Sequence, residues 1–405
     1  MAVDPRQILA GFLTLTMFFM LVNMIKRDHF DTIEIKQSQT ITISEKPSTN
    51  NIETESRIGL WKENDPPLRH CWSKLQPKEK RKGYITLTLI NGAHYHLSQI
   101  ADAVAVARYL GATLVVPDIQ GSSSREKRKF GEIYDIDKFV NNLVGVVEIA
   151  RDPTTITAGI PAIVRIPTRP RHDVIDERVE PIFRVTRSVR LVSYFPSLNM
   201  KIRGFQKREV DSAFCLGMFG TLDLQPELLT VADQMIEKLR SLTRKSDGHF
   251  IAIDLRLNLL QLKGCKVTSG RNRCFSAQEI GNFLRKTGFT SETVIYLTQS
   301  KWHKEFDPLK SIFPRTYTKE SVIPGDKMDL ILDRKSIELE AIDFHICTHS
   351  DIFVPAIPGL FYANVVGRRI AAGRTQILVP TSNPTSGSLS RYVSDKSHLA
   401  YSCLC

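Results

Sequence analysis

The sequence predicts an α/β protein of two halves, each with a parallel sheet, behind a membrane anchor and a polar stem. Strand-like and helix-like segments alternate over 83–119 and again over 250–370. Such alternation is typical of parallel sheets covered by helices. An apolar run of 18 residues lies near the N-terminus, and polar sequence without hydrophobic periodicity separates it from the first strand.

The apolar run covers residues 8–25 and is bounded by Arg6 and by Lys26-Arg27. A helix of this length rises about 27 Å, enough for a thin bilayer. We expect a retained signal anchor after a short tail at 1–7. A cleaved signal peptide fits less well, because no small-x-small site precedes the charged flank. A buried helix is the third interpretation, and the flanking charges leave the orientation open.

Residues 26–80 are polar and predict a stem or linker, so ordered structure is expected from about Lys82. The first half, 81–240, begins with a β-branched strand at 83–90. A helix at 97–111 has apolar residues at helical spacing and stops at Gly111. A strand at 112–117 completes a βαβ unit, and a helix at 225–243 leads out of this half. The Pro- and Arg-rich region 150–212 receives no assignment.

The second half, 245–375, repeats the alternation after a basic connector at 244–249. The predicted strands are 250–257, 293–299 and 351–356, and the predicted helices are 277–288, 335–346 and one from about Gly359. We expect the last segment, 376–405, to pack back on the body.

Parallel sheets bind ligands beyond the carboxyl ends of their strands, and the first such loop here is 91–96. Gly92, next to Asn91, permits close approach of a ligand, and the N–H groups of the following helix can bind an anion. His94 and His96 are polar candidates in this loop. An ordinary βα turn with exposed histidines explains the same residues.

The second loop carries Asp254 and Arg256, which alternation places on the same face of an otherwise apolar strand. A permanently charged, planar guanidinium suits a bidentate grip on phosphate. Asp254 could orient Arg256, act as a base or neutralise it. A buried structural ion pair is the alternative, although its desolvation cost makes a pair without a function less expected.

The third loop follows the strand 351–356, where a Pro-Gly turn leads into a helix. Its backbone N–H groups around Gly359–Phe361 are placed to bind a diphosphate. Neither the glycine pattern of a Rossmann dinucleotide site nor that of a P-loop is present.

An Asp-x-Asp pair at Asp135 and Asp137 could bind a divalent ion through oxygen ligands, or one aspartate could cap a helix. We favour the cap and expect no metal site. The formal net charge of +12 suggests anionic partners. The basic clusters 125–129 and 201–209 lack interleaved aromatics, so we expect solvated faces rather than nucleic-acid binding, which the anchor also contradicts.

The seven cysteines include no CxxC pair, which disfavours a zinc ribbon or a thioredoxin-like site. Cys265 and Cys274 bracket a short loop and could form a disulfide in an oxidising lumen.

Six segments together resemble the plant protein O-fucosyltransferase-like glycosyltransferases, and within them the mannan synthesis-related group. These segments are CWSK at 71–74, 83–119, 250–265, YLTQSKW at 296–302, 350–370 and HLAYSC at 398–403. The resemblance implies a GT-B architecture, with two Rossmann-like domains facing across a cleft, and metal-independent inverting transfer from a GDP-fucose-type nucleotide sugar to a glycan acceptor. It also implies a type II Golgi membrane protein with a luminal catalytic domain, acting in cell-wall mannan synthesis without a further cofactor.

Carried over residue by residue, the resemblance implies donor contacts at Arg256 and in the third motif. The donor set is Arg256, Asp351, Gly359, Leu360, Phe361 and Arg369. Arg256 would neutralise the leaving diphosphate. Asp254, His94 or His96 is the candidate base where one is needed.

All three loops depart from the family pattern. His94 replaces an asparagine, Leu97 replaces an arginine, and Asp254 replaces a histidine. In the third motif, Pro358-Gly359-Leu360 stands where relatives carry Asp-Gly-Asn. These changes motivate an alternative, a catalytically silent relative that binds or stabilises a mannan synthase. A mannan synthase or another Golgi glycosyltransferase is the protein partner considered.

Overall fold

The computed structural model describes residues 61–69, 83–120, 127–151, 160–167, 169–194, 212–243, 248–262, 274–332, 337–381 and 389–404. The predicted anchor at 8–25 and the basic cluster at 201–209 lie outside these residues. No helix within the described ranges is long and apolar enough to cross a membrane.

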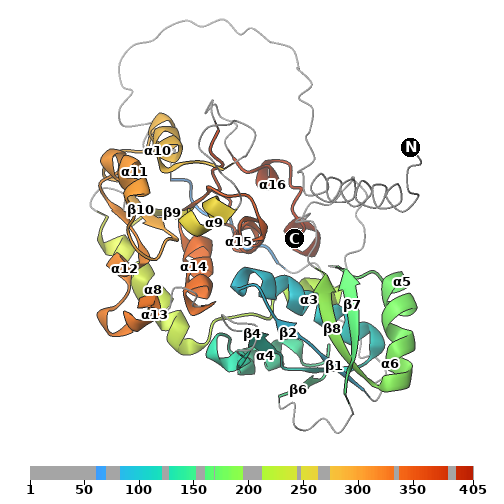
Figure 1. Cartoon of the computed structure of the whole chain (residues 1–405). Coiled ribbons are helices and arrows are strands. Elements are labelled where there is room, and N and C mark those ends of the chain that lie inside the picture. The colour runs from blue at the N-terminus through green and yellow to red at the C-terminus, as the bar shows by residue number, and fades with distance from the viewer. Residues whose placement is uncertain are drawn as a thin grey trace, which may run out of the picture. The chain divides into compact units, whose positions relative to one another are not determined.

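The first half contains a parallel five-stranded sheet, in the order β6-β3-β1-β8-β7 (Figure 1). The strands are β1 (Tyr84–Thr86), β3 (Thr113–Val115), β6 (Ile149–Ala150), β7 (Ala162–Pro167) and β8 (Ser188–Tyr194). The predicted strand at 83–90 is split, since Thr88–Leu89 forms β2 in a small sheet with β4 (Asp118–Gln120) and β5 (Lys127–Arg128). The parallel sheet predicted from the first βαβ unit is confirmed.

The helices of the first half begin with α3 (Ala93–Leu110), which starts four residues before the predicted helix and ends at left-handed Gly111. Asp135 caps α4 (Ile136–Leu143) by accepting a hydrogen bond from the Lys138 N–H at 3.0 Å. This contact confirms the capping interpretation of the Asp-x-Asp pair. The remaining helices of the half are α5 (His172–Val174), α6 (Glu180–Thr186), α7 (Ser212–Phe219) and α8 (Pro226–Ser241), with a 3-10 turn at Phe130–Glu132 and a π turn at Ile175–Val179.

The second half contains a four-stranded parallel sheet, in the order β11-β10-β9-β12. Its strands are β9 (Phe250–Asp254), β10 (Val294–Leu297), β11 (Thr316–Tyr317) and β12 (Ile352–Pro355). Its helices are α9 (Leu257–Leu262), α10 (Ala277–Lys286), α11 (Asp307–Ile312), α12 (Lys319–Val322), α13 (Asp329–Leu332), α14 (Ile337–His349) and α15 (Leu360–Ala371), with 3-10 turns at Lys304–Phe306 and Gly325–Lys327. The predicted strands and helices of this half are confirmed, with ends shifted by a few residues.

Strand β9 is apolar throughout because both of its faces are buried. Phe250 and Ala252 pack into the larger core, which continues into the first half, whereas Ile251 and Ile253 pack into a second core. Continuous apolar runs are typical of parallel strands covered on both faces. The alternation places Asp254 on the face of Phe250 and Ala252, the side on which α14 contacts β9.

Residues 52–405 form one compact unit, within which α3 of the first half contacts α14 and α15 of the second (Figure 1). Arg368 of α15 donates hydrogen bonds to the carbonyl oxygens of Phe219 and Leu222, each at 3.0 Å. These contacts join the C-terminal part of α15 to the end of α7 and thus connect the two halves.

The described part of the predicted stem, 61–69, packs against the second half. Trp61 stacks on His249 with ring centroids 5.2 Å apart, and the Asp65 N–H donates to the Gly373 carbonyl at 2.9 Å. The folded body therefore includes residues N-terminal of the expected start near Lys82.

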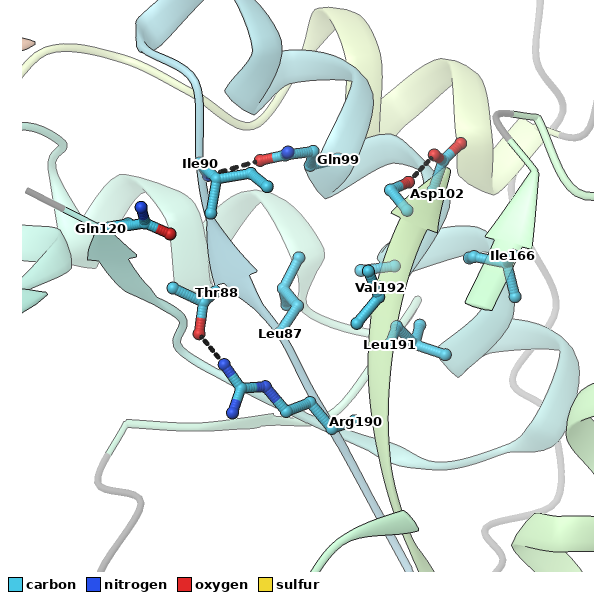
Figure 2. A pocket seen from close by; sticks show the side chains of 12 residues that line it. Leu87, Thr88, Ile90, Gln99, Asp102, Gln120, Ile166, Arg190, Leu191 and Val192 are labelled. Atoms are coloured by element: carbon cyan, nitrogen blue, oxygen red, sulfur yellow. Dashed lines mark hydrogen bonds between the residues drawn. The ribbon is translucent and has the colours of Figure 1, made fainter. Parts of the chain in front are cut away.

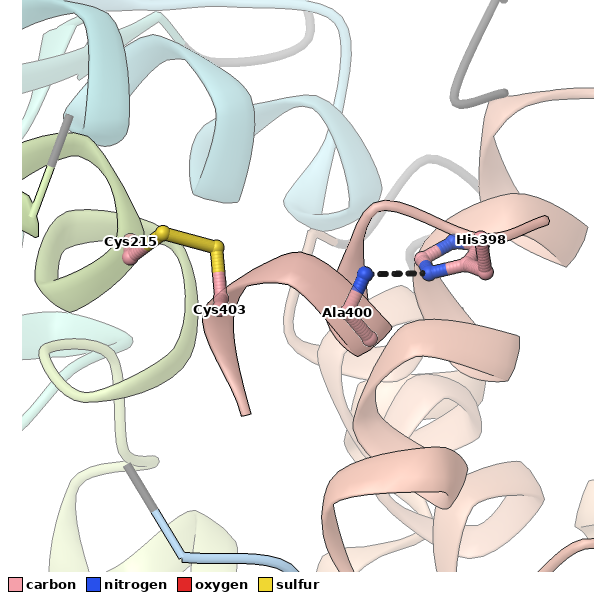
Figure 3. Close-up of a disulfide and its surroundings, with 4 residues drawn as sticks. All are labelled: Cys215, His398, Ala400 and Cys403. Carbon is pink, nitrogen blue, oxygen red and sulfur yellow. Dashed lines mark hydrogen bonds between the residues drawn. A yellow bond between two sulfur atoms is a disulfide. The ribbon is translucent and has the colours of Figure 1, made fainter. Parts of the chain in front are cut away.

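The described C-terminal residues lie against the body through α16 (Arg391–Ser394) and α17 (Ala400–Cys403). A disulfide joins Cys403 to Cys215 in α7, and buried His398 accepts a hydrogen bond from the Ala400 N–H at 3.0 Å (Figure 3). The sequence does not predict this disulfide, whose cysteines are 188 residues apart. It closes the C-terminal segment onto the first half.

Candidate functional site

The carboxyl end of β9 presents Asp254 and Arg256 as a hydrogen-bonded ion pair. Arg256 Nε donates to Asp254 Oδ1 at 3.0 Å, and Thr298, which follows β10, donates to the same oxygen at 3.1 Å. Asp254 is only 2% exposed, whereas the Arg256 side chain is 14% exposed. Asp254 therefore orients the guanidinium and leaves its Nη groups for other partners.

Arg256 is also held from its flat face. Its Cζ lies 4.7 Å from the centroid of the Phe361 ring, a cation–π contact that fixes the plane of the guanidinium. Burial lowers its pKa, but the carboxylates of Asp254, Glu340 and Asp343 outweigh this effect and raise it. The residue is a permanent cation at the edge of the sheet.

Glu340 of α14 brings the first and second predicted loops together. Its Oε1 lies 3.9 Å from Arg256 Nη1 and contacts Nδ1 of His94, the second residue of α3. Burial raises the pKa of Glu340, but the charges of His94 and Arg256 outweigh it and lower the pKa. An ionised carboxylate thus lies where the N-terminus of α3 meets Arg256. The helix dipole and the guanidinium both make the electrostatic potential positive at this position.

The two histidines of the first loop have different environments. His94 faces Glu340, and its side chain is 16% exposed. His96 is fully buried, and its Nδ1 lies 2.7 Å from the Tyr134 hydroxyl. Burial lowers the pKa of His96 to about 3, so it is neutral in the folded protein. Of the two, only His94 belongs to the cluster around Arg256.

The third loop contributes the start of α15. Gly359 precedes the helix, Leu360 begins it, and Phe361 contacts Arg256 as described. The first N–H groups of a helix lack carbonyl partners within the helix and can bind an anion. Asn364, one turn into α15, donates to the His94 carbonyl oxygen at 2.5 Å. The start of α15 is thereby tied to the start of α3.

Two of the predicted donor contacts need correction. Asp351 precedes β12, at the opposite end of the sheet from Arg256, and accepts a hydrogen bond from the Phe250 N–H at 2.9 Å. Arg369 is fully buried near the end of α15. Its Nη atoms donate to the carbonyl oxygens of Cys347, Thr348, Ser350, Asp351 and Gln376 and to the Ser350 hydroxyl. Both residues brace the fold in the described structure, and neither reaches the cluster.

A buried network behind Arg256 supports the site. Lys319 Nζ lies 2.6 Å from Asp343 Oδ2, both side chains are 3% exposed, and Tyr296 donates to Asp343 Oδ1 at 2.7 Å. Burial raises the pKa of Asp343 to about 6, although the Lys319 charge opposes the rise. Lys319 also donates to the Thr298 carbonyl oxygen, next to the Asp254 contact. The network links α12 and α14 to the end of β10.

Sequence reasoning did not identify Glu340, Asp343 or Lys319. A signal was available in the helical segment IELEAIDFHIC, where Glu340 and Asp343 are three residues apart and thus share one face of the helix. The remaining predicted site residues are Asn91 and the two cysteines of the expected disulfide. Asn91 is exposed with φ of 65°, and Cys274 is disulfide-bonded, whereas Cys265 lies outside the described residues.

Gly92 provides the space for the Glu340 carboxylate. Its φ is 89°, and a Cβ there would lie 2.1 Å from Glu340 Oε2. We expect Gly92→Ala to displace this carboxylate and to lower the unfolding free energy by more than the about 1–3 kcal/mol of backbone strain alone. Gly248→Ala is the matched control, because its φ of 86° is similar and an added methyl would meet nothing within 4 Å. Chemical denaturation measures the unfolding free energy of both variants. Equal losses would contradict a steric clash between the added methyl group and Glu340.

A second polar site lies in the first half, behind the same β2–α3 loop. A pocket of about 200 Å³ is lined by β2, β4, β7, β8 and α3 (Figure 2). Its polar side chains are Thr88, Gln99, Asp102, Gln120, Arg190 and Ser193. Gln99 Oε1 accepts a hydrogen bond from the Ile90 N–H at 3.0 Å. The pocket and the Arg256 cluster therefore share one loop.

Asp102 at this pocket makes stability depend on pH. Burial raises its pKa from 3.8 to about 7, although Ser193 and the Arg169 N–H donate hydrogen bonds to it. A raised folded-state pKa means that the stabilising contribution is complete below pH 4 and is lost as pH rises through 7. The change is at most about 4 kcal/mol, from roughly three pKa units.

We therefore expect Asp102→Asn to flatten the dependence of unfolding free energy on pH between about 4 and 7. Chemical denaturation across this range is the measurement. The control is Asp118→Asn, whose half-exposed side chain lies 3.7 Å from Lys127. An unchanged slope in the Asp102 variant would show that this carboxyl group does not titrate as its burial implies.

Comparisons with known proteins identify the family of this chain. The family model described as GDP-fucose protein O-fucosyltransferase matches residues 84–372. Protein MANNAN SYNTHESIS-RELATED 1 of Arabidopsis thaliana is 47% identical over 423 residues, and Protein MANNAN SYNTHESIS-RELATED of Trigonella foenum-graecum is 42% identical over 417 residues. Each alignment covers 100% of both chains.

Among solved structures, NodZ alpha-1,6-fucosyltransferase soaked with GDP-fucose is similar with 15% identity and a TM-score of 0.44. That match covers 77% of this chain and 98% of the NodZ chain. The family match extends over β1 to α15 and thus includes all three loops of the cluster. The chain belongs to the GDP-fucose protein O-fucosyltransferase family of glycosyltransferases.

Proposed function

We propose that this protein is a Golgi glycosyltransferase of mannan synthesis that transfers a sugar, with inversion and without a metal, from a GDP-sugar to a glycan acceptor. The observation that carries the proposal is the position of Arg256. Its guanidinium lies at the carboxyl end of β9, is oriented by Asp254 and Phe361, and is near the starts of α3 and α15. Transfer from GDP-fucose, which the family's description names, develops negative charge on the leaving diphosphate, and a cation at such a place would stabilise that charge.

Arg256 binds the diphosphate of the donor and neutralises the charge that develops on it as the sugar leaves. The N–H groups at Gly359–Phe361 add hydrogen bonds to the same phosphates. Stabilising the leaving group in this way is where such an enzyme gains most of its rate. The two-domain GT-B architecture is part of this proposal.

The acceptor is a mannan-type glycan, in keeping with the names of the full-length relatives. Sugar hydroxyls need several hydrogen-bond donors and acceptors at close range. The pocket beside the β2–α3 loop offers amide, carboxyl, hydroxyl and guanidinium groups from six side chains. It is a suitable place for one residue of the acceptor chain.

The proposed compartment is the Golgi lumen, with residues 1–7 in the cytosol and the anchor at 8–25 in the membrane. The Cys215–Cys403 disulfide supports it, because structural disulfides persist in the oxidising secretory route. A mannan synthase or another Golgi glycosyltransferase is the proposed protein partner.

The proposal is tested with the full chain purified in detergent, GDP-fucose or GDP-mannose, and manno-oligosaccharides. We expect sugar transfer, with inversion visible in the anomeric NMR signals of the product. A folded protein that binds the synthase but neither binds nor turns over any GDP-sugar would overturn the enzyme assignment and support the silent-partner alternative.

A further inference from the structure

The contact between Glu340 and His94 defines the protonation of the imidazole. A carboxylate can only accept hydrogen bonds, and the charge of Arg256, 3.9 Å from Glu340 Oε1, favours the ionised form of Glu340. The proton of neutral His94 must therefore be on Nδ1, which faces Glu340. Nε2 is then the basic nitrogen, and within the described part of the chain it has no hydrogen-bond partner.

The other two candidate bases are occupied or enclosed. Asp254 is 2% exposed, and its Oδ1 accepts hydrogen bonds from Arg256 and Thr298. His96 is fully buried against Tyr134. Neither can reach a hydroxyl group of an incoming substrate. His94 is the remaining candidate with access to solvent.

The charged and titratable groups around His94 come from three elements. Glu340 faces it from α14, Arg256 at the end of β9 lies beside the same carboxylate, and Tyr95 and His96 adjoin it on α3. From α15 it meets only the Phe361 ring, 5.8 Å away, and Asn364. An imidazolium formed here gains the Glu340 carboxylate as a direct partner.

Resting on the function proposed above, we propose that Glu340 and His94 form the base of the transfer reaction. His94 Nε2 takes the proton of the acceptor hydroxyl as its oxygen bonds to the anomeric carbon of the donor sugar. The bond from that carbon to the diphosphate oxygen breaks, and its electron pair leaves with the nucleoside diphosphate beside Arg256. Glu340 is a positioning residue that holds the tautomer and stabilises the imidazolium, as carboxylate–histidine pairs do in other enzymes.

Donor hydrolysis offers a test that needs no identified acceptor, because a water molecule in the acceptor position gives its proton to the same nitrogen. The full chain is assayed with GDP-fucose and GDP-mannose across pH. We expect His94→Ala to lower kcat by about 10²–10⁴-fold, the usual contribution of a general base. Added imidazole should restore part of the rate, and GDP binding measured by calorimetry should be retained.

The variant Glu340→Gln distinguishes a role of Glu340 in positioning His94 from a purely structural role. The amide can still accept from Nδ1–H but carries no charge, so the acidic limb of the rate–pH profile should move to lower pH. Glu340→Asp should return the limb toward its original place. A merely structural role would leave the limb where it is in both variants.

His172→Ala is the matched histidine control, since His172 begins α5 and packs on Tyr109 with ring centroids 4.6 Å apart. It should keep the wild-type rate and show no response to imidazole. Wild-type turnover with full activity in His94→Ala would overturn this inference alone. A wild-type chain that neither binds nor hydrolyses any GDP-sugar would instead overturn the proposed function.

Discussion

Replacing Arg256 with alanine is expected to lower kcat/KM for sugar transfer by about 10³-fold or more, the loss seen when a cation stabilising a transferring phosphate is removed. The reason is geometric as well as electrostatic. Asp254 and Phe361 fix both the edge and the face of the guanidinium, so its position is set before the donor binds. Arg256→Lys should recover only part of the rate, because an ammonium cannot form the planar fork.

The loss must be separated from unfolding, because alanine at this position leaves Asp254 buried without its cation. The double variant Asp254→Asn/Arg256→Gln removes both charges and should be more stable than Arg256→Ala while still inactive. Arg240→Ala is the matched control. Arg240 also pairs with an aspartate, Asp351 at 3.8 Å, and lies over an aromatic ring, Phe250 at 5.8 Å, but at the amino end of β9. Comparable losses in the Arg240 and Arg256 variants would contradict the assignment.

Breaking the Lys319–Asp343 pair should have the largest effect on stability. Lys319→Met leaves a carboxylate at 3% exposure without its partner, and such changes cost about 3–5 kcal/mol. Chemical denaturation measures the loss. The double variant Lys319→Met/Asp343→Asn should recover much of it, because neither side chain is then a lone buried charge.

An exposed pair supplies the control for this prediction. Arg151 and Asp137 lie 2.7 Å apart, nearly the separation of the buried pair, but their side chains are 55% and 76% exposed. Arg151→Met should cost less than about 1 kcal/mol, as is usual for surface pairs. Equal losses at the two sites would mean that burial does not govern the strength of the Lys319–Asp343 interaction.

Much of the second half could be predicted because its local patterns agree with its tertiary environment. Strand β9 is a continuous apolar run since two cores cover it, and the charged residues after it lie at the carboxyl edge where ligands bind. The region 150–212 could not be assigned. It supplies β7 and β8, and β8 pairs directly with β1 although the two are about a hundred residues apart in the chain. Local sequence does not indicate such pairing.

Asp351 and Arg369 show that a match to a family motif does not by itself place a residue at the site. Asp351 precedes its strand, and Arg369 is nine residues beyond the start of α15, a rise of about 14 Å. Their positions along these elements place both far from the loop, and the family pattern alone had suggested them. Glu340 is a site residue that the motifs did not indicate, since its contact with His94 spans 246 residues of sequence. Only the tertiary structure brings these two groups together.

Calorimetric titration of GDP into the full chain tests most directly whether the cluster around Arg256 binds a nucleoside diphosphate. We expect saturable binding by the wild-type protein, loss of that binding in Arg256→Gln, and unchanged binding in Arg240→Ala. Absence of GDP binding by a folded wild-type chain, or equal affinity in the Arg256 variant, would contradict this role of the cluster.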